Sequence, residues 1–314
     1  MPAEASPIAA CAPARRRALQ ASHEGVRARQ REAYWARACE PYREARGRPG
    51  NPASLVTVQG LQFALPEENA PGGLSARLRE GWLPWRDVTN RWSLGIGSAA
   101  IDIGANIGTT AVVRLLSGYA QYVYAIEPDP DNFACLVQTV AANGLDGFVL
   151  PDACAISDVT GTGAFRRTDR IGNHHLVAAT TPGSRHKPVP VRTMTLDDWM
   201  RTYEVEAESV SFVKVDVQGW ESRVLAGAQG LLAHPHVVWS LEVSPKHLEQ
   251  AGTPMPVLLE QLAKHFTYAL DTRRKGDPIP VTVPGALADA VSYMGHGQAE
   301  SYTNLLLYRV DPTS

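Results

Sequence analysis

Short apolar runs alternate with segments of helical periodicity from residue 98 to residue 310. The runs are Ala99–Ile103, Tyr122–Ile126, Phe148–Leu150, Phe212–Val217, Val237–Val243, Thr267–Asp271 and Tyr302–Val310. Strands that alternate with helices of about ten to fifteen residues form βαβ units, whose parallel strands are buried on both faces and therefore read as continuous apolar runs. The pattern predicts an α/β fold with a doubly wound, mostly parallel sheet.

Helical periodicity is found in four segments between these runs, namely 108–118, Asp129–Asn143, Glu221–Ala233 and Pro254–Phe266. Two further segments interrupt the rhythm. Ser157–Arg192 is rich in Gly, Thr and Arg and predicts a hairpin or loop over the edge of the sheet, and Arg274–Ala299 also lacks the pattern. Because loops on a rigid scaffold usually carry specificity, we expect both to border a ligand pocket.

The chain before residue 98 follows a different pattern, which predicts three parts: an extension over 1–50, a lead-in over 51–97 and a main domain over 98–314. Residues 1–50 are rich in Ala and Arg and favour a mixed-charge helix. One interpretation is a solvated helix that packs on the main domain. The other is a dimerisation arm or a lid over the substrate. Residues 55–65 alternate apolar and polar positions around Gly60, which predicts a β-hairpin.

Charge and cysteine content narrow the classes of partner. The formal net charge is −2, so no overall field favours nucleic acid or an anionic membrane. The four cysteines form no CxxC pair, which fits reduced thiols in a cytoplasmic protein. No apolar stretch approaches about 18 residues, so no transmembrane helix is expected. The N-terminus lacks a signal-peptide pattern, although an Ala- and Arg-rich start can mimic a transit peptide.

A glycine turn follows the first strand of the main domain, in the sequence Asp102-Ile103-Gly104-Ala105-Asn106-Ile107-Gly108. Ligands of open α/β sheets bind beyond the carboxyl ends of the strands, and glycine lets the backbone bend sharply against them. The spacing is GxxxG, which lacks the middle glycine that a dinucleotide pyrophosphate needs. Glu127 ends the second strand, where a carboxylate can accept hydrogen bonds from ribose hydroxyls. The turn and Glu127 therefore favour a nucleoside ligand without phosphates, such as S-adenosylmethionine.

The predicted cofactor residues lie at the ends of successive strands. They are Asp102, Gly104, Ala105, Asn106, Gly108, Thr109, Glu127, Pro128, Asp152 and Asp216. Structural alternatives remain at three of these positions. Asn106 could cap the following helix, Glu127 could form a surface salt bridge, and Asp152 could shape a turn instead of bonding an adenine amino group.

These motifs resemble the FkbM-type S-adenosylmethionine-dependent methyltransferases. The matching stretches are Asp102–Gly108, Ala125–Pro130, Thr195–Asp197, Lys214–Glu221, Leu241–Val243 and Thr303–Leu307. The resemblance, which does not reach residues 1–90, implies a Rossmann-like class I methyltransferase domain over 98–314. It also implies methyl transfer, usually to a hydroxyl of a sugar or secondary metabolite. The chain departs from the family pattern at two places. The family usually carries Glu where this chain has Gln218, and small residues where this chain has the loop Gly172-Asn173-His174-His175.

An alcohol is a poor nucleophile, so methyl transfer to it benefits from a positioned base. Lys214 and Asp216 lie two residues apart and share a face, and Glu242 ends the next strand at the same edge. We expect Asp216, with Lys214 and Glu242, to take the proton, and Lys214 to be paired with Asp216, Glu221 or Glu242 because an unpaired buried charge is costly. A purely structural ion pair is the alternative. His175, beside His174, is a second candidate base.

The acceptor is expected to be a small molecule or glycan, without nucleic acid or membrane as partner, and a homodimer stays open. No ligand spacing demands a metal, although three carboxylates, Asp216, Glu221 and Glu242, could gather around Mg²⁺. Rival functions are an N-methyltransferase acting on a small molecule, peptide or nucleic acid, and a non-catalytic scaffold. A nicotinamide oxidoreductase is disfavoured by the missing middle glycine.

Overall fold

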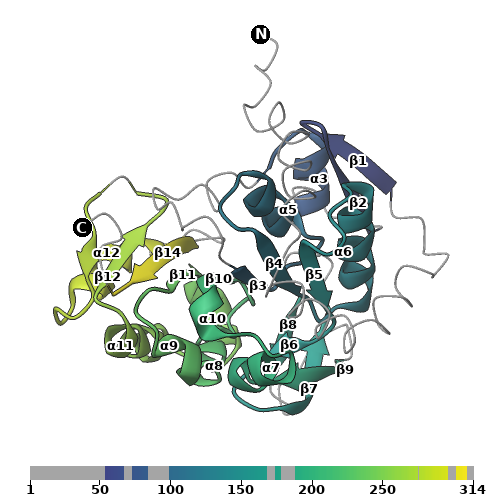
Figure 1. The fold of residues 1–314 in the computed structure, drawn as a ribbon. Coiled ribbons are helices and arrows are strands. Elements are labelled where there is room, and N and C mark those ends of the chain that lie inside the picture. Colours follow the sequence, from purple (N-terminus) through teal and green to yellow (C-terminus); the bar gives the residue numbers. More distant parts are fainter. Residues whose placement is uncertain are drawn as a thin grey trace, which may run out of the picture.

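The computed structural model describes residues 54–66, 73–83, 99–167, 174–177, 188–274, 276–295 and 302–309. Its centre is an eight-stranded sheet with the spatial order β13-β12-β14-β11-β10-β3-β4-β5 (Figure 1). The bounds in that order are Ile279–Pro280, Tyr268–Asp271, Thr303–Tyr308, Val238–Val243, Val210–Val215, Ala99–Ile103, Tyr122–Ile126 and Val149–Asp152. The five strands from β11 to β5 are parallel, whereas β14, β12 and β13 pair antiparallel. The predicted α/β class with a mostly parallel sheet is confirmed.

Alternate residues of the central strands enter two separate cores. In β3, for example, Ile101 and Ile103 enter one core and Ala100 the other. The first core is covered by α7 (Leu196–Thr202), α8 (Glu221–Ala226), α9 (Gln229–Leu232), α10 (Pro245–Gln250), α11 (Met255–His265) and α12 (Ala286–Val291). The second is covered by α3 (Leu74–Arg79), α5 (Thr109–Leu116) and α6 (Pro130–Ala142). Helices on both faces are the doubly wound arrangement that the apolar runs predict.

The chain reverses direction across the sheet between β3 and β10. From β3 it builds outward through β4 to β5, and it then returns to place β10 on the other side of β3. Such a switch point leaves a crevice at the carboxyl ends of the two strands, because the following loops diverge to opposite sides. This crevice positions the candidate site.

The predicted hairpin is confirmed as β1 (Ser54–Val58) and β2 (Leu61–Leu65). It packs on α6, where Thr139 Oγ1 accepts a hydrogen bond of 3.0 Å from the Ala64 amide. The described part of the lead-in thus shares the second core of the main domain. The predicted extension over 1–50 lies outside the described residues, so the division into three parts stays a prediction.

Segment 157–192 contributes to a second sheet rather than to a loop alone. Its strands have the order β6-β9-β7-β8, with bounds Ala155–Ile156, Val189–Met194, Gly161–Arg166 and His175–Val177. The pairing of β7 with β8 is the antiparallel hairpin that was one of the two expectations. The sequence pattern does not predict α7, α10 or α12, nor the short 3-10 turns Ala207–Ser209 and Ser292–Gly295.

The single helix predicted over Glu221–Ala233 is wrong, because the chain breaks it into α8 and α9. Gly227 lies between them and passes so close to Ser157 that a Cβ on Gly227 would sit 2.1 Å from the Ser157 carbonyl oxygen. The α9 helix then starts afresh, with the Asp197 carboxylate accepting from the Gly230 amide at 3.0 Å. A tertiary contact therefore overrides the helical periodicity.

Candidate functional site

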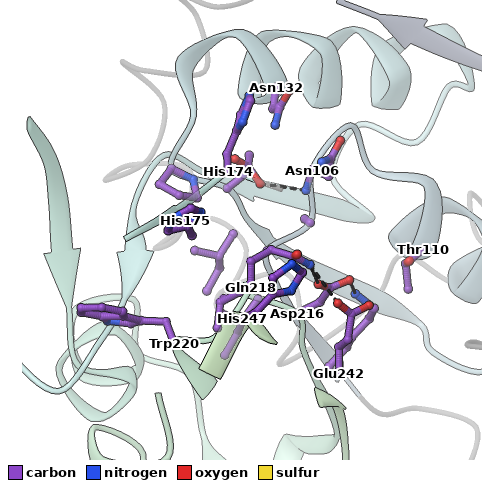
Figure 2. Close-up of a pocket in the computed structure, with 18 of the residues that line it drawn as sticks. Asn106, Thr110, Asn132, His174, His175, Asp216, Gln218, Trp220, Glu242 and His247 are labelled. Atoms are coloured by element: carbon purple, nitrogen blue, oxygen red, sulfur yellow. Dashed lines mark hydrogen bonds and ion pairs between the residues drawn. The ribbon is translucent and has the colours of Figure 1, made fainter. Parts of the chain in front are cut away.

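A cavity of about 300 Å³ lies in the crevice beyond β3, β4, β10 and β11. Its wall also includes residues of the second sheet, of α10 and of the lead-in segment before β3. Figure 2 shows His174 and His175 on one side of this cavity and Asp216, Gln218 and Glu242 on another. The segment 157–192 borders it through Phe165 and the two histidines, as expected.

Seven of the ten predicted cofactor residues line this cavity: Gly104, Ala105, Asn106, Thr109, Glu127, Pro128 and Asp216. Asp102, Gly108 and Asp152 do not. All four predicted catalytic residues line it, namely His175, Lys214, Asp216 and Glu242. None of the described residues of the other segment expected at the pocket, Arg274–Ala299, lines the cavity, and His296 of that segment lies outside the described residues.

The glycine turn is fixed by backbone contacts on both of its sides. Gly104 has φ +82°, and a Cβ there would lie 2.0 Å from the Asp216 carbonyl oxygen. On the other side, the Gly104 amide donates to the Ile126 carbonyl at 2.9 Å. Only glycine combines the left-handed backbone with this close approach. The turn therefore lies directly against the loop that follows β10.

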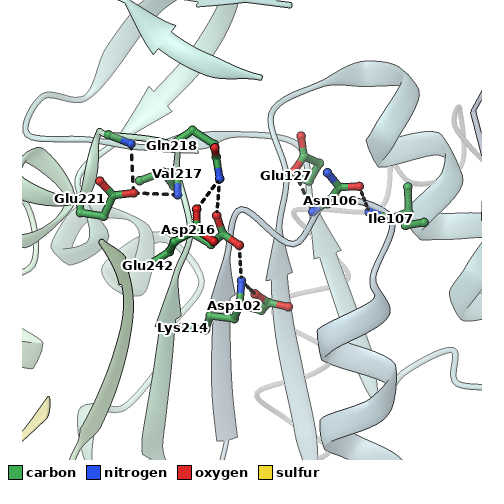
Figure 3. A network of polar contacts seen from close by, with 11 residues as sticks. Asp102, Asn106, Ile107, Glu127, Lys214, Asp216, Val217, Gln218, Glu221 and Glu242 are labelled. Atoms are coloured by element: carbon green, nitrogen blue, oxygen red, sulfur yellow. Dashed lines mark hydrogen bonds and ion pairs between the residues drawn. The ribbon is translucent and has the colours of Figure 1, made fainter. Parts of the chain in front are cut away.

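Glu127 accepts two hydrogen bonds from backbone amides. Its Oε2 is 2.9 Å from the Asn106 nitrogen and its Oε1 is 2.9 Å from the Asp129 nitrogen (Figure 3). Burial raises the pKa of Glu127 to about 8, although these amide hydrogen bonds oppose the shift. Glu127 is 4% exposed, which excludes the alternative of a surface salt bridge.

Asn106 does not cap the following helix, which was its structural alternative. The N-cap of α5 is Gly108, and the Asn106 side-chain oxygen accepts from the adjacent Ile107 amide at 2.8 Å. Asn106 itself has a left-handed backbone with φ +53°. In this conformation the backbone nitrogen of Asn106 donates to the Glu127 carboxylate, which connects the turn to the end of β4.

Lys214 lies between two carboxylates, that of Asp216 in the cavity wall and that of Asp102 behind it. Its Nζ lies 2.9 Å from Asp216 Oδ2 and 3.9 Å from Asp102 Oδ1. Burial opposes the charge of Lys214, but Asp216 and Asp102 outweigh it and hold the Lys214 pKa above its ordinary value. Of the three predicted partners for Lys214, the structure thus selects Asp216. Burial raises the pKa of Asp102, which lies behind the cavity wall.

Glu242 faces Asp216 across the amide group of Gln218. The Gln218 Nε2 donates to Asp216 Oδ1 at 2.8 Å and to Glu242 Oε1 at 2.9 Å (Figure 3). Burial, followed by the nearby Asp216, raises the pKa of Glu242 well above its ordinary value. Sequence reasoning identified Gln218 only as a departure from the family pattern, and it missed this bridging contact.

Glu221 is turned away from these carboxylates. Its Oε1 accepts from the amides of Val217 at 3.2 Å and Gly219 at 3.1 Å, so it supports the loop before α8. The arrangement of Asp216, Glu221 and Glu242 around Mg²⁺ is therefore not formed. In the part of the chain that the structure describes, no group of three acidic, His or Cys side chains has a geometry that could hold a metal.

Asp152 is engaged by three other side chains, one of which is the Cys154 thiol at 3.4 Å. Arg192 of β9 lies 2.6 Å from its Oδ1, and the Trp199 indole nitrogen of α7 donates to its Oδ2 at 2.7 Å. These contacts join the end of β5 to the second sheet and to α7. A role for Asp152 toward adenine stays a prediction.

Several residues of the cavity wall are not among the predicted site residues. They are Arg77, Trp82, Asn132, Trp220, Lys246, His247, Tyr302 and Asn304. Arg77 and Trp82 precede the main domain, and the Arg77 guanidinium carbon lies 3.6 Å from the centre of the Trp82 ring. Only the folding of the lead-in against the sheet brings these two residues to the site.

The methyltransferase FkbM domain matches residues 102–273 of this chain. The chain belongs to the FkbM methyltransferase family. Among curated relatives of this methyltransferase, the 2-O-methyltransferase NoeI of Sinorhizobium fredii is 29% identical over 175 residues, which cover 52% of this chain and 70% of NoeI. The 31-O-demethyl-FK506 methyltransferase FkbM of Streptomyces tacrolimicus is 29% identical over 161 residues, which cover 42% of this chain and 60% of that enzyme.

Among solved structures, the methyltransferase FkbM of Methylobacillus flagellatus is similar with a TM-score of 0.44 and 18% identity. That match covers 72% of this methyltransferase and 47% of the other chain. Among the described residues, none of the helices is long and apolar enough to cross a membrane.

Proposed function

We propose that this methyltransferase uses S-adenosylmethionine to methylate a hydroxyl oxygen of a small molecule or glycan, a sugar or secondary metabolite in particular, in the cytoplasm. The observation that supports the proposal is the close approach of the glycine turn to the Asp216 backbone, because a cofactor bound on this turn would then lie beside the proposed base. The names of both curated relatives denote methyl transfer to oxygen. The buried free thiols of Cys135 and Cys154 fit a reducing compartment.

The cavity fits S-adenosylmethionine better than a phosphate-bearing cofactor. Gly104 leaves room where a Cβ would fill the turn, and Asn106 and Glu127 present polar groups at the adjacent strand end. Lys214 is paired with Asp216 and so is not open to a phosphate group. Asn106 also stands where a pyrophosphate site needs its middle glycine, which disfavours a dinucleotide.

S-adenosylmethionine supplies, when bound, a methyl group activated by its sulfonium sulfur. In the proposed reaction the acceptor oxygen forms its bond to the methyl carbon as the carbon–sulfur bond breaks, and the hydroxyl proton passes to the Asp216 carboxylate. Lys214 Nζ, 2.9 Å from Asp216 Oδ2, holds that carboxylate in place. Positioning the hydroxyl next to the methyl carbon is the larger part of the acceleration.

A labelling experiment tests this function. The purified protein is incubated with S-adenosylmethionine carrying a ¹³C methyl group and with a panel of methyl glycosides and 31-O-demethyl-FK506. We expect one product with a mass gain of one methyl group and a ¹³C shift typical of a methyl ether. Label found only on nitrogen, or calorimetry showing tighter binding of NAD than of S-adenosylmethionine, would contradict the proposal. Cofactor binding without transfer to any acceptor would favour the scaffold.

A further inference from the structure

Gln218 occupies the space between the two carboxylates that face the cavity, Asp216 and Glu242. One amide nitrogen reaches both, at 2.8 Å and 2.9 Å, while the other Asp216 oxygen is held by Lys214 (Figures 2 and 3). The reverse orientation of the amide would set its oxygen against two carboxylate oxygens, which is repulsive. Each hydrogen of the Gln218 amide group therefore has its own acceptor.

The loop around Gln218 is built to hold this side chain in place. Gln218 has a left-handed backbone with φ +55°, a conformation that a residue with a Cβ adopts only at a cost in free energy. Glu221 fixes the amides on both sides of it, those of Val217 and Gly219. A Cβ on Gly219 would lie 2.2 Å from the His247 carbonyl oxygen, so α10 closes the loop from behind.

In this chain the residue between the two carboxylates is a donor to both. Two carboxylates that approach each other repel, and ordinarily one of them takes up a proton or a cation. The Lys214 ammonium is bonded to Asp216 and does not reach Glu242 within hydrogen-bond distance among the contacts of the described residues. A neutral amide with two hydrogens bridges the pair without adding charge.

We propose that Gln218 is a positioning residue for methyl transfer, which holds the carboxylates of Asp216 and Glu242 in one arrangement through its two amide hydrogens. The inference rests on the proposed function, in which Asp216 accepts the hydroxyl proton. Gln218 acts through these carboxylates and need not touch the acceptor. Its removal loosens the base and changes the titration of Glu242.

The Glu242 carboxyl is surrounded by several charged groups. Lys214 lies near it at the end of β10 and Asp216 directly after that strand, while Glu221 of α8, whose carboxylate is bonded to the loop amides, acts on it through space. Asp102 of β3 lies beyond Lys214, and Lys246 and His247 of α10 line the same cavity. The Gln218 amide lowers the pKa of Glu242 against the dominant effect of burial. Loss of that donor should therefore move the Glu242 titration to higher pH.

Titration by NMR tests this without an acceptor. The variants are Gln218→Met, which keeps the length but has no hydrogen to donate, and Gln218→Glu, which keeps the shape but adds charge. In protein labelled with ¹³C at the Glu carboxyl carbons, the Glu242 signal is identified by its absence in Glu242→Gln. We expect its midpoint to rise by about one pH unit or more in both variants. The same changes at Gln62, exposed on β2, are the matched controls and should leave it unchanged.

Kinetics separate a positioning role from a structural one. With an acceptor from the panel, Gln218→Met should lower kcat about tenfold or more, while the KM of the acceptor and the Kd of S-adenosylmethionine stay within about threefold. An unchanged Glu242 titration, or full kcat with only a lower melting temperature, would overturn the inference. If the wild-type protein fails to bind S-adenosylmethionine or methylates only nitrogen, the proposed function fails, and the NMR titration still decides the role of Gln218.

Discussion

The two sides of the cavity hold their carboxylates by different kinds of donor. On the β4 side, Glu127 is bound mainly by backbone amides, with the Asn132 side chain as a lesser donor, and these amides are fixed by the glycine turn and the start of α6. On the β10 and β11 side, Asp216 and Glu242 are bound by the side chains of Lys214 and Gln218. Backbone donors come with the fold, whereas side-chain donors depend on the residue at one position. The first side suits a cofactor shared by a family, and the second suits chemistry that is adjusted to an acceptor.

The largest effect is expected from Lys214→Met, because it leaves buried carboxylates without their cation. Breaking a buried ion pair by removing one partner costs about 3–5 kcal/mol in the free energy of unfolding. Denaturant unfolding of wild type and variant measures this cost, and activity should fall as well. Lys264→Met is the control, since Lys264 pairs with Glu260 at 3.4 Å on the exposed surface of α11. Equal losses in the two variants would show that the Lys214 cluster is not special.

Asp216→Asn should lower turnover by roughly a hundredfold or more, the effect of removing a general base. The variant keeps the shape of the side chain and removes its charge, so the Kd of S-adenosylmethionine should change little. Steady-state kinetics and calorimetry on the same preparation measure both quantities. Asp131→Asn, at an exposed position of α6, is the matched control. Full turnover in Asp216→Asn would make the cluster structural and direct the search for a base to His174 or His175.

Glu127→Ala tests the side that backbone amides hold. If this carboxylate accepts hydrogen bonds from the cofactor, binding should weaken by about 1.5–3 kcal/mol, the range for charged hydrogen bonds. The kcat at saturating cofactor should change much less, which distinguishes the two sides of the cavity. Calorimetry with S-adenosylmethionine measures the effect, and Glu249→Ala on the exposed face of α10 is the control. Equal affinity in wild type and Glu127→Ala would refute the assignment.

The stability of the ligand-free protein should depend on pH through the same carboxyl. Burial raises the pKa of Glu127 to about 8 and that of Glu221 to about 7, both above the ordinary value of 4.5. Between pH 4.5 and these raised pKa values, the folded state binds more protons than the unfolded state, and this difference stabilises the fold. The stabilisation is complete below about pH 4.5 and is lost as the pH rises through 7 and 8. Melting temperatures between about pH 5 and pH 9 should fall. In Glu127→Gln the melting temperature should fall less steeply with pH than in wild type. Parallel curves of melting temperature against pH for the two proteins would contradict this prediction.

The smallest effect is expected from His175→Ala, at the cavity wall formed by the second sheet. Loss of one polar contact with the acceptor should lower kcat/KM for that acceptor about threefold to tenfold, with no change in cofactor affinity. The exposed His236→Ala is the control. A larger loss of cofactor affinity than of acceptor turnover would assign this wall to the cofactor.

The sequence predicts the regular part of the fold well, because apolar runs report burial directly. The strands Ala99–Ile103 and Tyr122–Ile126 agree residue for residue with β3 and β4. The break between α8 and α9 could not be predicted, because it depends on the close approach of Gly227 to Ser157, 70 positions earlier in the chain. The partner of Lys214 could be narrowed to three residues but not chosen, since the choice depends on where Glu221 points.

The bridging role of Gln218 could not be predicted from the sequence either. Its contacts require a left-handed backbone at a residue that has no general preference for it. The wall residues Arg77 and Trp82 depend on how the lead-in packs, and no motif marks them. Local pattern thus predicts which strand ends meet, whereas side-chain bonding within the site follows from tertiary geometry.

The contact between Gly104 and the Asp216 carbonyl oxygen limits how related sequences can diverge. Because the contact is made by main-chain atoms, no replacement at position 216 can make room for a side chain at position 104. A mutation at Gly104 would have to displace the end of β10, and with it Asp216, the proposed base. We therefore expect related sequences to vary in the second sheet and the lead-in more readily than in the spacing between Gly104 and Asp216.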